Sequence, residues 1–362
     1  MKIHLKKSFF NEKAQLFFEN GDLKVFLFRY ESGVEAIRFE NSVGHIVVLP
    51  YKGQMIWEAV FGGRTLNMYR IHKTEAKDVD FFLNSYGSFF FHCGALRMGC
   101  PAEKDTHPLH GELPYAPYDR AWLTGGSDER GEYVCLSGSY LYNRGFGPCY
   151  QAVPYVKFYS GSALLEISIT ITNLANDPME LMYQAHLNWR PVDNGRLVQS
   201  YGWTPEDMEP RMSVPRHFSV APGYRDFLTR LKARPELTRV LRPEDNYCPE
   251  VCFYLHHPRT DADGRVHLMQ VHPDGNADLL LYKPSECECG IRWISKTPNQ
   301  NGLGLSFPST CYPEGYLVEK ANGRVKALAP GETFTSTLLA GALTPDEAVR
   351  EEAFIDTLMR SE

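Results

Sequence analysis

The sequence predicts an all-β protein, a large antiparallel β-sandwich with a short C-terminal helix. Apolar and polar residues alternate with a period of two in many short segments, as in Ile167–Thr172, where isoleucines alternate with serine and threonine. Gly, Pro, Asn and Asp separate the segments, as turns separate the strands of sandwiches and barrels. The other such segments are Leu23–Tyr30, Val43–Leu49, Ala152–Tyr159, Val251–Leu255, Val266–Val271, Leu279–Tyr282 and Thr335–Leu343.

Helix signals are few. In Thr344–Glu347 the threonine can cap a helix, the proline fits its first turn and the glutamate completes a capping box. This pattern predicts a terminal helix that ends near Met359. A second helix is predicted over Tyr224–Ala233, where three apolar side chains share one face before Pro235 ends it.

Length and charge restrict the class of protein. No low-complexity linker or internal repeat divides the 362 residues, so we predict a single sandwich domain over residues 1–362. The formal net charge of -6 leaves no basic field for a phosphate backbone, which argues against a nucleic-acid partner. No apolar stretch approaches the roughly 20 residues of a membrane span, so we expect no membrane partner.

Cysteine usage indicates the compartment. Nine cysteines are scattered without paired spacing, which predicts reduced thiols and a cytoplasmic protein. The basic residues after Met1 lead into no apolar segment of signal-peptide length, in keeping with that location. Cys287 and Cys289 have no second pair at zinc-site spacing. We expect no metal ion and no cofactor, and either a monomer or a homodimer.

Chemically useful side chains are densest in Asp105–Pro114, which contains His107, His110 and Glu112. Histidine is the usual side chain for proton transfer near neutral pH, and the aromatic residues that follow suit the apolar faces of a sugar ring. The alternative is a proline-rich loop with solvent-exposed histidines.

A second candidate is His186, in the strand-like segment Met182–Arg190. Alternation places His186 and Asn188 on one face of this strand. A single histidine on a strand can equally be a hydrogen-bonded structural residue.

Four motifs, in the same order along the chain, resemble the aldose 1-epimerase (galactose mutarotase) superfamily and in particular its sugar-epimerase-like branch. The resemblance spans most of the chain and implies a large antiparallel β-sandwich with a small-molecule sugar as partner. The motifs are Leu49–Ala59 followed by a Gly-Arg pair, the Leu-His-Gly of Leu109–Gly111, Met182–Gly195, and the Leu-x-Pro-Gly-Glu of Leu328–Glu332.

The resemblance also implies a reaction, the interconversion of sugar anomers by ring opening. His186 would give a proton to the ring oxygen, while His110 orients the sugar by hydrogen bonds. Both would line an open cleft and face one another. The third catalytic group of the family is a glutamate that removes the proton from the anomeric hydroxyl.

The sequence departs from the family at this glutamate, because the family's Gly-Leu-Glu-Pro corresponds to Gly304–Pro308, which has no glutamate. Glu314 is our candidate for the role, with a solvated turn as its alternative. Glu112 is another candidate, because on an extended backbone it shares a face with His110.

Substrate binding is assigned to His107, Arg97, Glu112 and Asn188. The fork of donors on Arg97 suits vicinal hydroxyls, and a salt bridge on the rim is the alternative. A non-catalytic carbohydrate-binding protein that kept the cleft is the alternative to an isomerase. A sandwich-fold hydrolase or lyase is a third interpretation and would need a differently placed acid and base.

Overall fold

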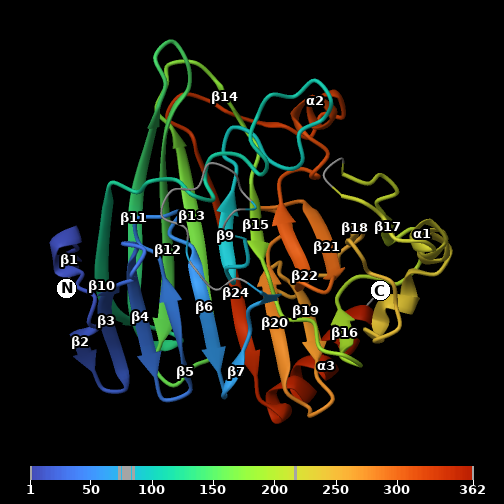
Figure 1. Ribbon diagram of the computed structural model, residues 1–362, viewed down its shortest axis with the longest axis horizontal. Coiled ribbons are helices and arrows are strands. Elements are labelled where there is room, and N and C mark those ends of the chain that lie inside the picture. The colour runs from blue at the N-terminus through green and yellow to red at the C-terminus, as the bar shows by residue number, and fades with distance from the viewer. Residues whose placement is uncertain (1, 72–74, 76–82, 84–85, 216–217, 361–362) are drawn as a thin grey trace.

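The computed structural model describes residues 2–71, 75, 83, 86–215 and 218–360. In these residues two large antiparallel β-sheets form the two layers of a sandwich (Figure 1). One sheet has nine strands and the other thirteen, and a separate pair of short strands, β14 (Met179–Leu181) and β23 (Lys326–Leu328), lies beside them. The predicted antiparallel β-sandwich is confirmed.

The nine-stranded sheet contains five of the predicted segments. On β13 (Leu164–Asn173) the three isoleucines are buried in the core between the sheets, as their alternation predicts. In spatial order the strands are β1 (Lys2–His4), β10 (Arg120–Asp128), β11 (Gly131–Asn143), β12 (Cys149–Tyr159), β13, β24 (Thr333–Leu343), β20 (Ala277–Tyr282), β19 (Val266–Val271) and β16 (Arg196–Gln199).

The thirteen-stranded sheet carries the candidate site. Its two shortest strands are β7 (Arg64–Thr65), which pairs with β6, and β8 (Tyr69–Arg70), which pairs with β22. In order, the others are β17 (Met208–Pro210), β18 (Val251–Leu255), β21 (Cys289–Lys296), β22 (Gln300–Ser309), β15 (Gln184–Leu187), β9 (Phe90–Cys93), β6 (Ile56–Phe61), β5 (Gly44–Val48), β4 (Glu35–Asn41), β3 (Leu23–Arg29) and β2 (Gln15–Asn20).

Three α-helices lie in the described part of the chain, and none is long and apolar enough to cross a membrane. They are α1 (Tyr224–Ala233), α2 (Tyr316–Ala321) and α3 (Pro345–Arg360), with 3-10 turns at Lys7–Phe9 and Pro235–Arg239. The bounds of α1 are those predicted. The predicted terminal helix is confirmed, and the glutamate half of its capping box forms, because the Glu347 carboxylate accepts hydrogen bonds from both the amide and the hydroxyl of Thr344.

His267 of β19 connects the nine-stranded sheet to α3 through its side chain. Its Nδ1 lies 2.5 Å from Oε1 of Glu351 on the helix, and its Nε2 lies 3.1 Å from Oδ2 of Asp261. Burial lowers the pKa of His267, but the two carboxylates outweigh burial and leave it raised above 6.5. The folded protein therefore favours the charged imidazolium at this joint.

The contacts of His267 with Glu351 and Asp261 should make the stability of the protein depend on pH. A raised folded-state pKa contributes stability that is fully present below the unfolded value of about 6.5 and is lost as the pH rises through the folded value. The contribution is about 1.4 kcal/mol for each pH unit by which the folded-state pKa exceeds the unfolded-state pKa. Urea unfolding of the wild type and of His267→Gln between pH 5.5 and 9 measures it. We expect the difference in unfolding free energy to shrink with rising pH; a constant difference would contradict the assignment.

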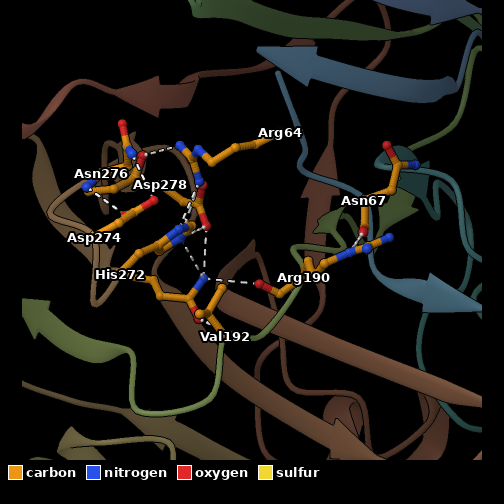
Figure 2. Close-up of polar contacts among 10 residues, drawn as sticks. Arg64, Asn67, Arg190, Val192, His272, Asp274, Asn276 and Asp278 are labelled. Atoms are coloured by element: carbon orange, nitrogen blue, oxygen red, sulfur yellow. Dashed lines mark hydrogen bonds and ion pairs between the residues drawn. The ribbon is translucent and has the colours of Figure 1, made fainter. Parts of the chain in front are cut away.

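A closed polar cluster joins the two sheets (Figure 2). Arg64 of the thirteen-stranded sheet donates from Nη1 to His272 Nδ1 at 2.9 Å and to Asp278 Oδ1 of β20 at 3.3 Å. His272 Nε2 and the Gln270 amide then contact the other oxygen of Asp278 at 2.9 and 2.8 Å. Because these groups satisfy one another, we assign the cluster to holding the layers together.

A second apolar cluster lies apart from the main core. It contains Trp57, Phe91, Trp293 and Phe307, which come from strands of the thirteen-stranded sheet. Neighbouring residues of the same strands, such as Phe90, belong to the main core instead, so the two clusters occupy opposite faces of this sheet. The second cluster forms the floor of the candidate site.

Candidate functional site

Strand β15 presents the first of the candidate histidines. Ala185 and Leu187 of this strand belong to the main core, so the alternate residues Gln184 and His186 emerge on the opposite face. Both line a cavity of about 180 Å³. That volume far exceeds the roughly 10–15 Å³ that one water needs, and it gives room for a ring-sized ligand.

Aromatic rings hold the imidazole of His186 in place. Its ring centroid lies 3.9 Å from that of Phe307 and 4.6 Å from that of Phe91. Its Nδ1 is buried and has no hydrogen-bond partner in the described part of the protein. Gln184 Oε1, two residues earlier, is likewise buried without a partner there. A buried polar atom is costly to leave without a hydrogen bond, so these two atoms mark where a polar ligand would bind.

His110 lies against His186, although 75 residues separate them in the sequence. The ring centroids are 5.3 Å apart with the planes at 90°. The predicted proximity of the two rings is confirmed. His110 lies on a loop, where its carbonyl accepts from Gly94 N at 3.0 Å and its amide donates to Gly99 O at 3.0 Å.

Glu112 secures this loop and does not share a face with His110. The backbone is not extended here, since φ is +60° at His110 and +81° at Gly111. The Glu112 carboxylate therefore turns away from the cavity, where its Oε1 accepts from the amides of Ala95 and Leu96 at 3.0 and 2.9 Å and from the Tyr150 hydroxyl at 2.7 Å. The expectation of a shared face was wrong because the turn rotates the side chain.

The carboxylate of the cavity comes from a residue that the sequence did not indicate. Among the described lining residues, Glu250 is the one acidic side chain. It precedes β18, and its side chain is 15% exposed. Trp293 donates its indole N–H to Glu250 Oε2 at 2.7 Å, and the Trp293 ring lies 6.1 Å from that of His186. The indole thus contacts the carboxylate and lies close to the imidazole.

Burial favours the neutral forms of both groups. It is the main cause that lowers the pKa of His186 well below 6.5, and His110 adds to the effect while Asn188 opposes it. Burial also raises the pKa of Glu250 above 4.5, against the opposing influence of the Trp293 hydrogen bond and of Arg211. Opposite pKa shifts in two groups that line one cavity are typical of sites that transfer protons.

Glu314 lies behind the wall of the cavity and does not line it. Its carboxylate pairs with Arg211, whose Nε lies 2.7 Å from Oε1, and accepts a short hydrogen bond from the Tyr254 hydroxyl. Arg211 is the lining residue, and its Nη1 lies 4.0 Å from Glu250 Oε1. Glu314 is therefore connected to the cavity through a guanidinium.

Asn188 is also one layer removed from the cavity. Its side-chain nitrogen donates to the Ser88 carbonyl at 2.8 Å, and its oxygen accepts from the Tyr86 hydroxyl at 3.3 Å. The ring of Tyr86 in turn meets that of His186 edge to face, with centroids 6.0 Å apart. In this arrangement Asn188 orients a wall residue.

His107 and Arg97 line a second, open cavity of about 1600 Å³, which His110 and His186 do not line. The His107 ring donates from Nδ1 to the Pro108 carbonyl at 2.8 Å. The Arg97 guanidinium stacks 3.6 Å above the Tyr316 ring and pairs with Glu180 at 3.4 Å. The structure therefore does not bring these two residues together with His110 and His186.

A β-bulge explains why the family's glutamate position is not part of the cavity. On β22, Gly304 pairs with Trp293 and Phe307 with Ile291, so the register shifts between these two pairs. Bulges change which way side chains point. Ser306, at the position of the family's glutamate, contacts the core residue Tyr282 at 3.4 Å, and Phe307 lines the cavity instead.

Within the residues that the structure describes, no group of three or more His, Cys, Asp or Glu side chains could hold a metal ion.

The large antiparallel sandwich, with its terminal helix, is the fold of the galactose mutarotase-like proteins. A protein of Klebsiella pneumoniae subsp. pneumoniae named "putative aldose 1-epimerase" superposes with a TM-score of 0.83 at 13% sequence identity, over 99% of this chain and 96% of that chain. Galactose mutarotase-like proteins of Clostridium acetobutylicum and Lactobacillus casei give TM-scores of 0.59 and 0.52 at 15% and 14% identity, over 90% and 85% of this chain and 100% of theirs.

The family described as "Domain of unknown function (DUF4432)" matches residues 31–209. No curated protein matches the sequence. At identities of 13–15%, the structural similarity establishes the fold alone. Activity has to be argued from the cavity itself, because one fold hosts many functions.

Proposed function

We propose that the protein is an isomerase that interconverts the anomers of a free aldose, by opening and reclosing the sugar ring in the cavity of His110, His186 and Glu250. One observation carries the proposal: His186 Nδ1 lacks a partner among the described residues, in a ring-sized cavity that also contains a carboxyl group. Ring opening needs one group to take the proton of the anomeric hydroxyl and another to protonate the ring oxygen.

The directions of the two pKa shifts suggest the roles. Burial favours a neutral imidazole at His186, which can accept a proton, and a neutral carboxylic acid at Glu250, which can donate one, so we assign His186 as the base and Glu250 as the acid. His186 Nδ1 takes the proton of the anomeric hydroxyl, the C1–O bond of the ring breaks, a C1 carbonyl forms, and Glu250 protonates the released ring oxygen. His110 and the amide of Gln184 orient the sugar by hydrogen bonds.

Reclosure reverses each transfer. After the C1–C2 bond rotates, the hydroxyl returns its proton to Glu250 as it attacks the opposite face of the carbonyl. The His186 imidazolium then protonates the new anomeric oxygen. The resemblance described above implies these roles in the opposite sense, with His186 as acid and a glutamate as base. Over one full cycle each group acts once as acid and once as base.

Saturation-transfer exchange by NMR tests the proposal directly. The wild-type protein is added to a panel of neutral aldoses, and the rate of exchange between the two anomer signals is measured with and without protein. We expect acceleration for at least one aldose, with a rate that falls at low pH as His186 becomes charged and at high pH as Glu250 ionises. Binding without acceleration for every aldose would favour the carbohydrate-binding alternative and contradict the proposal.

The compartment also remains a proposal. All nine cysteines are free thiols, and Cys100 and Cys252 line the cavity. Free thiols persist in reducing compartments. We therefore place the protein in the cytoplasm, where soluble aldoses are metabolised.

A further inference from the structure

We propose that Glu314 is a positioning residue: by holding the guanidinium of Arg211, it keeps Arg211 from forming a close ion pair with Glu250. This role rests on the proton transfer proposed for Glu250. It assigns a function to a carboxylate that lies outside the cavity. It also explains why an arginine can line a cavity whose carboxyl group must act as an acid.

The geometry of Arg211 carries the inference. Its Nε lies 2.7 Å from Glu314 Oε1 and its Nη2 lies 3.4 Å from Glu314 Oε2, so one edge of the guanidinium faces Glu314. Nη1 is left 4.0 Å from Glu250 Oε1, at the outer limit of an ion pair. The Arg211 side chain is only 8% exposed, so water screens these charges little.

Two further donors keep Glu314 in place. The Tyr254 hydroxyl donates to Glu314 Oε1, and the Ser213 hydroxyl lies 3.5 Å from Oε2. Ser213 Oγ also accepts from Arg211 Nε at 3.0 Å. Tyr254 belongs to β18, the strand that Glu250 precedes, so the same strand fixes the position of both carboxylates. Glu314 thus has little freedom to release Arg211.

Within the described part of the chain, Arg211 and Glu314 are the charged groups that act on Glu250. Burial raises the pKa of each thiol and phenol near Glu250, so all of them are neutral near neutral pH. His186 shares the cavity and is neutral as well. Arg211 lowers the pKa of Glu250 and Glu314 raises it, after the larger effect of burial. The titratable and charged groups concerned are Arg211, Glu314, Cys100, Cys252, Tyr86 and Tyr224.

Substitution of Glu314 tests the role without relying on catalysis. Glu314→Gln keeps the shape and removes the charge, so Glu250 then faces an uncompensated guanidinium. The carboxyl carbon of Glu250, assigned through loss of its signal in Glu250→Gln, is titrated by ¹³C NMR in the wild type and the variant. We expect the Glu250 pKa to fall by roughly one pH unit in Glu314→Gln, and to rise in Arg211→Gln.

Glu352→Gln is the matched control. Glu352 forms a comparable paired interaction with Arg196, at 2.6 and 2.8 Å, on the remote helix α3. Its substitution should leave the Glu250 titration and the exchange rate unchanged. Circular dichroism and thermal unfolding verify that each variant is folded, and Tyr254→Phe, which keeps the Glu314 charge, provides a milder variant if Glu314→Gln does not fold. It should lower the Glu250 pKa by less than Glu314→Gln.

The outcomes separate this inference from the proposed function. An unchanged Glu250 titration in folded Glu314→Gln overturns the positioning role, even if the wild type accelerates anomer exchange. A lowered Glu250 pKa supports the role, even if no aldose is exchanged. When exchange is observed, the high-pH limb of its rate profile should move to lower pH by the same amount; a movement of the low-pH limb instead would overturn the assignment of Glu250 as the acid.

Discussion

Glu250→Gln is expected to lower the rate of anomer exchange by about 10²- to 10⁴-fold, the usual contribution of a general acid or base. Glutamine preserves the shape of the side chain and can still accept the hydrogen bond that Trp293 donates to Glu250. It cannot give up a proton to the ring oxygen. Saturation-transfer NMR measures the rate, and calorimetric titration with the same aldose measures binding, which should change little because the loss concerns the transition state.

Two variants complete this experiment. His186→Ala should cause a loss of similar size, since it removes the partner in proton transfer. Glu180→Gln is the control: Glu180 is a partly exposed carboxylate that pairs with Arg97 and Lys320 at the second cavity, away from His186. It should retain the wild-type rate. If Glu250→Gln kept more than about a tenth of the rate, another group would have to supply the proton.

Gly111→Ala is expected to lower the free energy of unfolding by more than about 4 kcal/mol, in the range of the most damaging single substitutions. Gly111 has φ +81°, and a β-carbon added there would lie 2.1 Å from the Arg97 carbonyl oxygen and 2.7 Å from that of Gly94. Both obstacles are backbone atoms, so no flexible side chain can move aside. The turn that carries His110 would have to open.

Gly161→Ala is the matched control for Gly111. Gly161 has φ +59°, but a β-carbon there would meet no atom within 4 Å. Its substitution isolates the cost of the left-handed backbone conformation, about 1–2 kcal/mol. Urea unfolding compares the two variants, and exchange measurements on the folded fraction should show a loss only for Gly111→Ala. Equal stabilities would mean that the His110 loop is loosely packed.

Alternation predicted the strands that are buried on one face more than on the other. β13 is the clearest case, with its isoleucines in the core and its threonines half-buried on the opposite face. Some strands buried on both faces were predicted as well, as β19 and β20 show, but others were not. β21 was missed because its residues are buried on both sides and include the charged Arg292, which donates to Gln199 and to the Leu305 carbonyl. Tertiary partners that lie far away in the sequence decided that strand.

The site could be predicted only in part. The resemblance pointed to His110 and His186, and their rings do lie together. Glu250 carries no comparable signal, because it is a single acidic residue before a short strand and reaches the cavity only when β18 pairs with β21. The bulge opposite Arg292 also has no recognisable sequence signal, yet it determines that Phe307 faces the cavity. Long-range pairing and local irregularity are what a linear pattern cannot convey.

Phe91 and Phe307 pack against the His186 ring and hold it in one orientation. A ring packed against two aromatic side chains cannot swing to follow its ligand, so in the proposed reaction one stationary nitrogen would serve both anomers. The sugar itself must then move: its aldehyde group rotates about the C1–C2 bond between ring opening and reclosure, so that the opposite face of the carbonyl is attacked. In the proposed reaction the cavity must therefore bind the hydroxyls far from C1 and leave C1 free to rotate. A cavity that fitted C1 more tightly would hinder this rotation and so slow the proposed turnover.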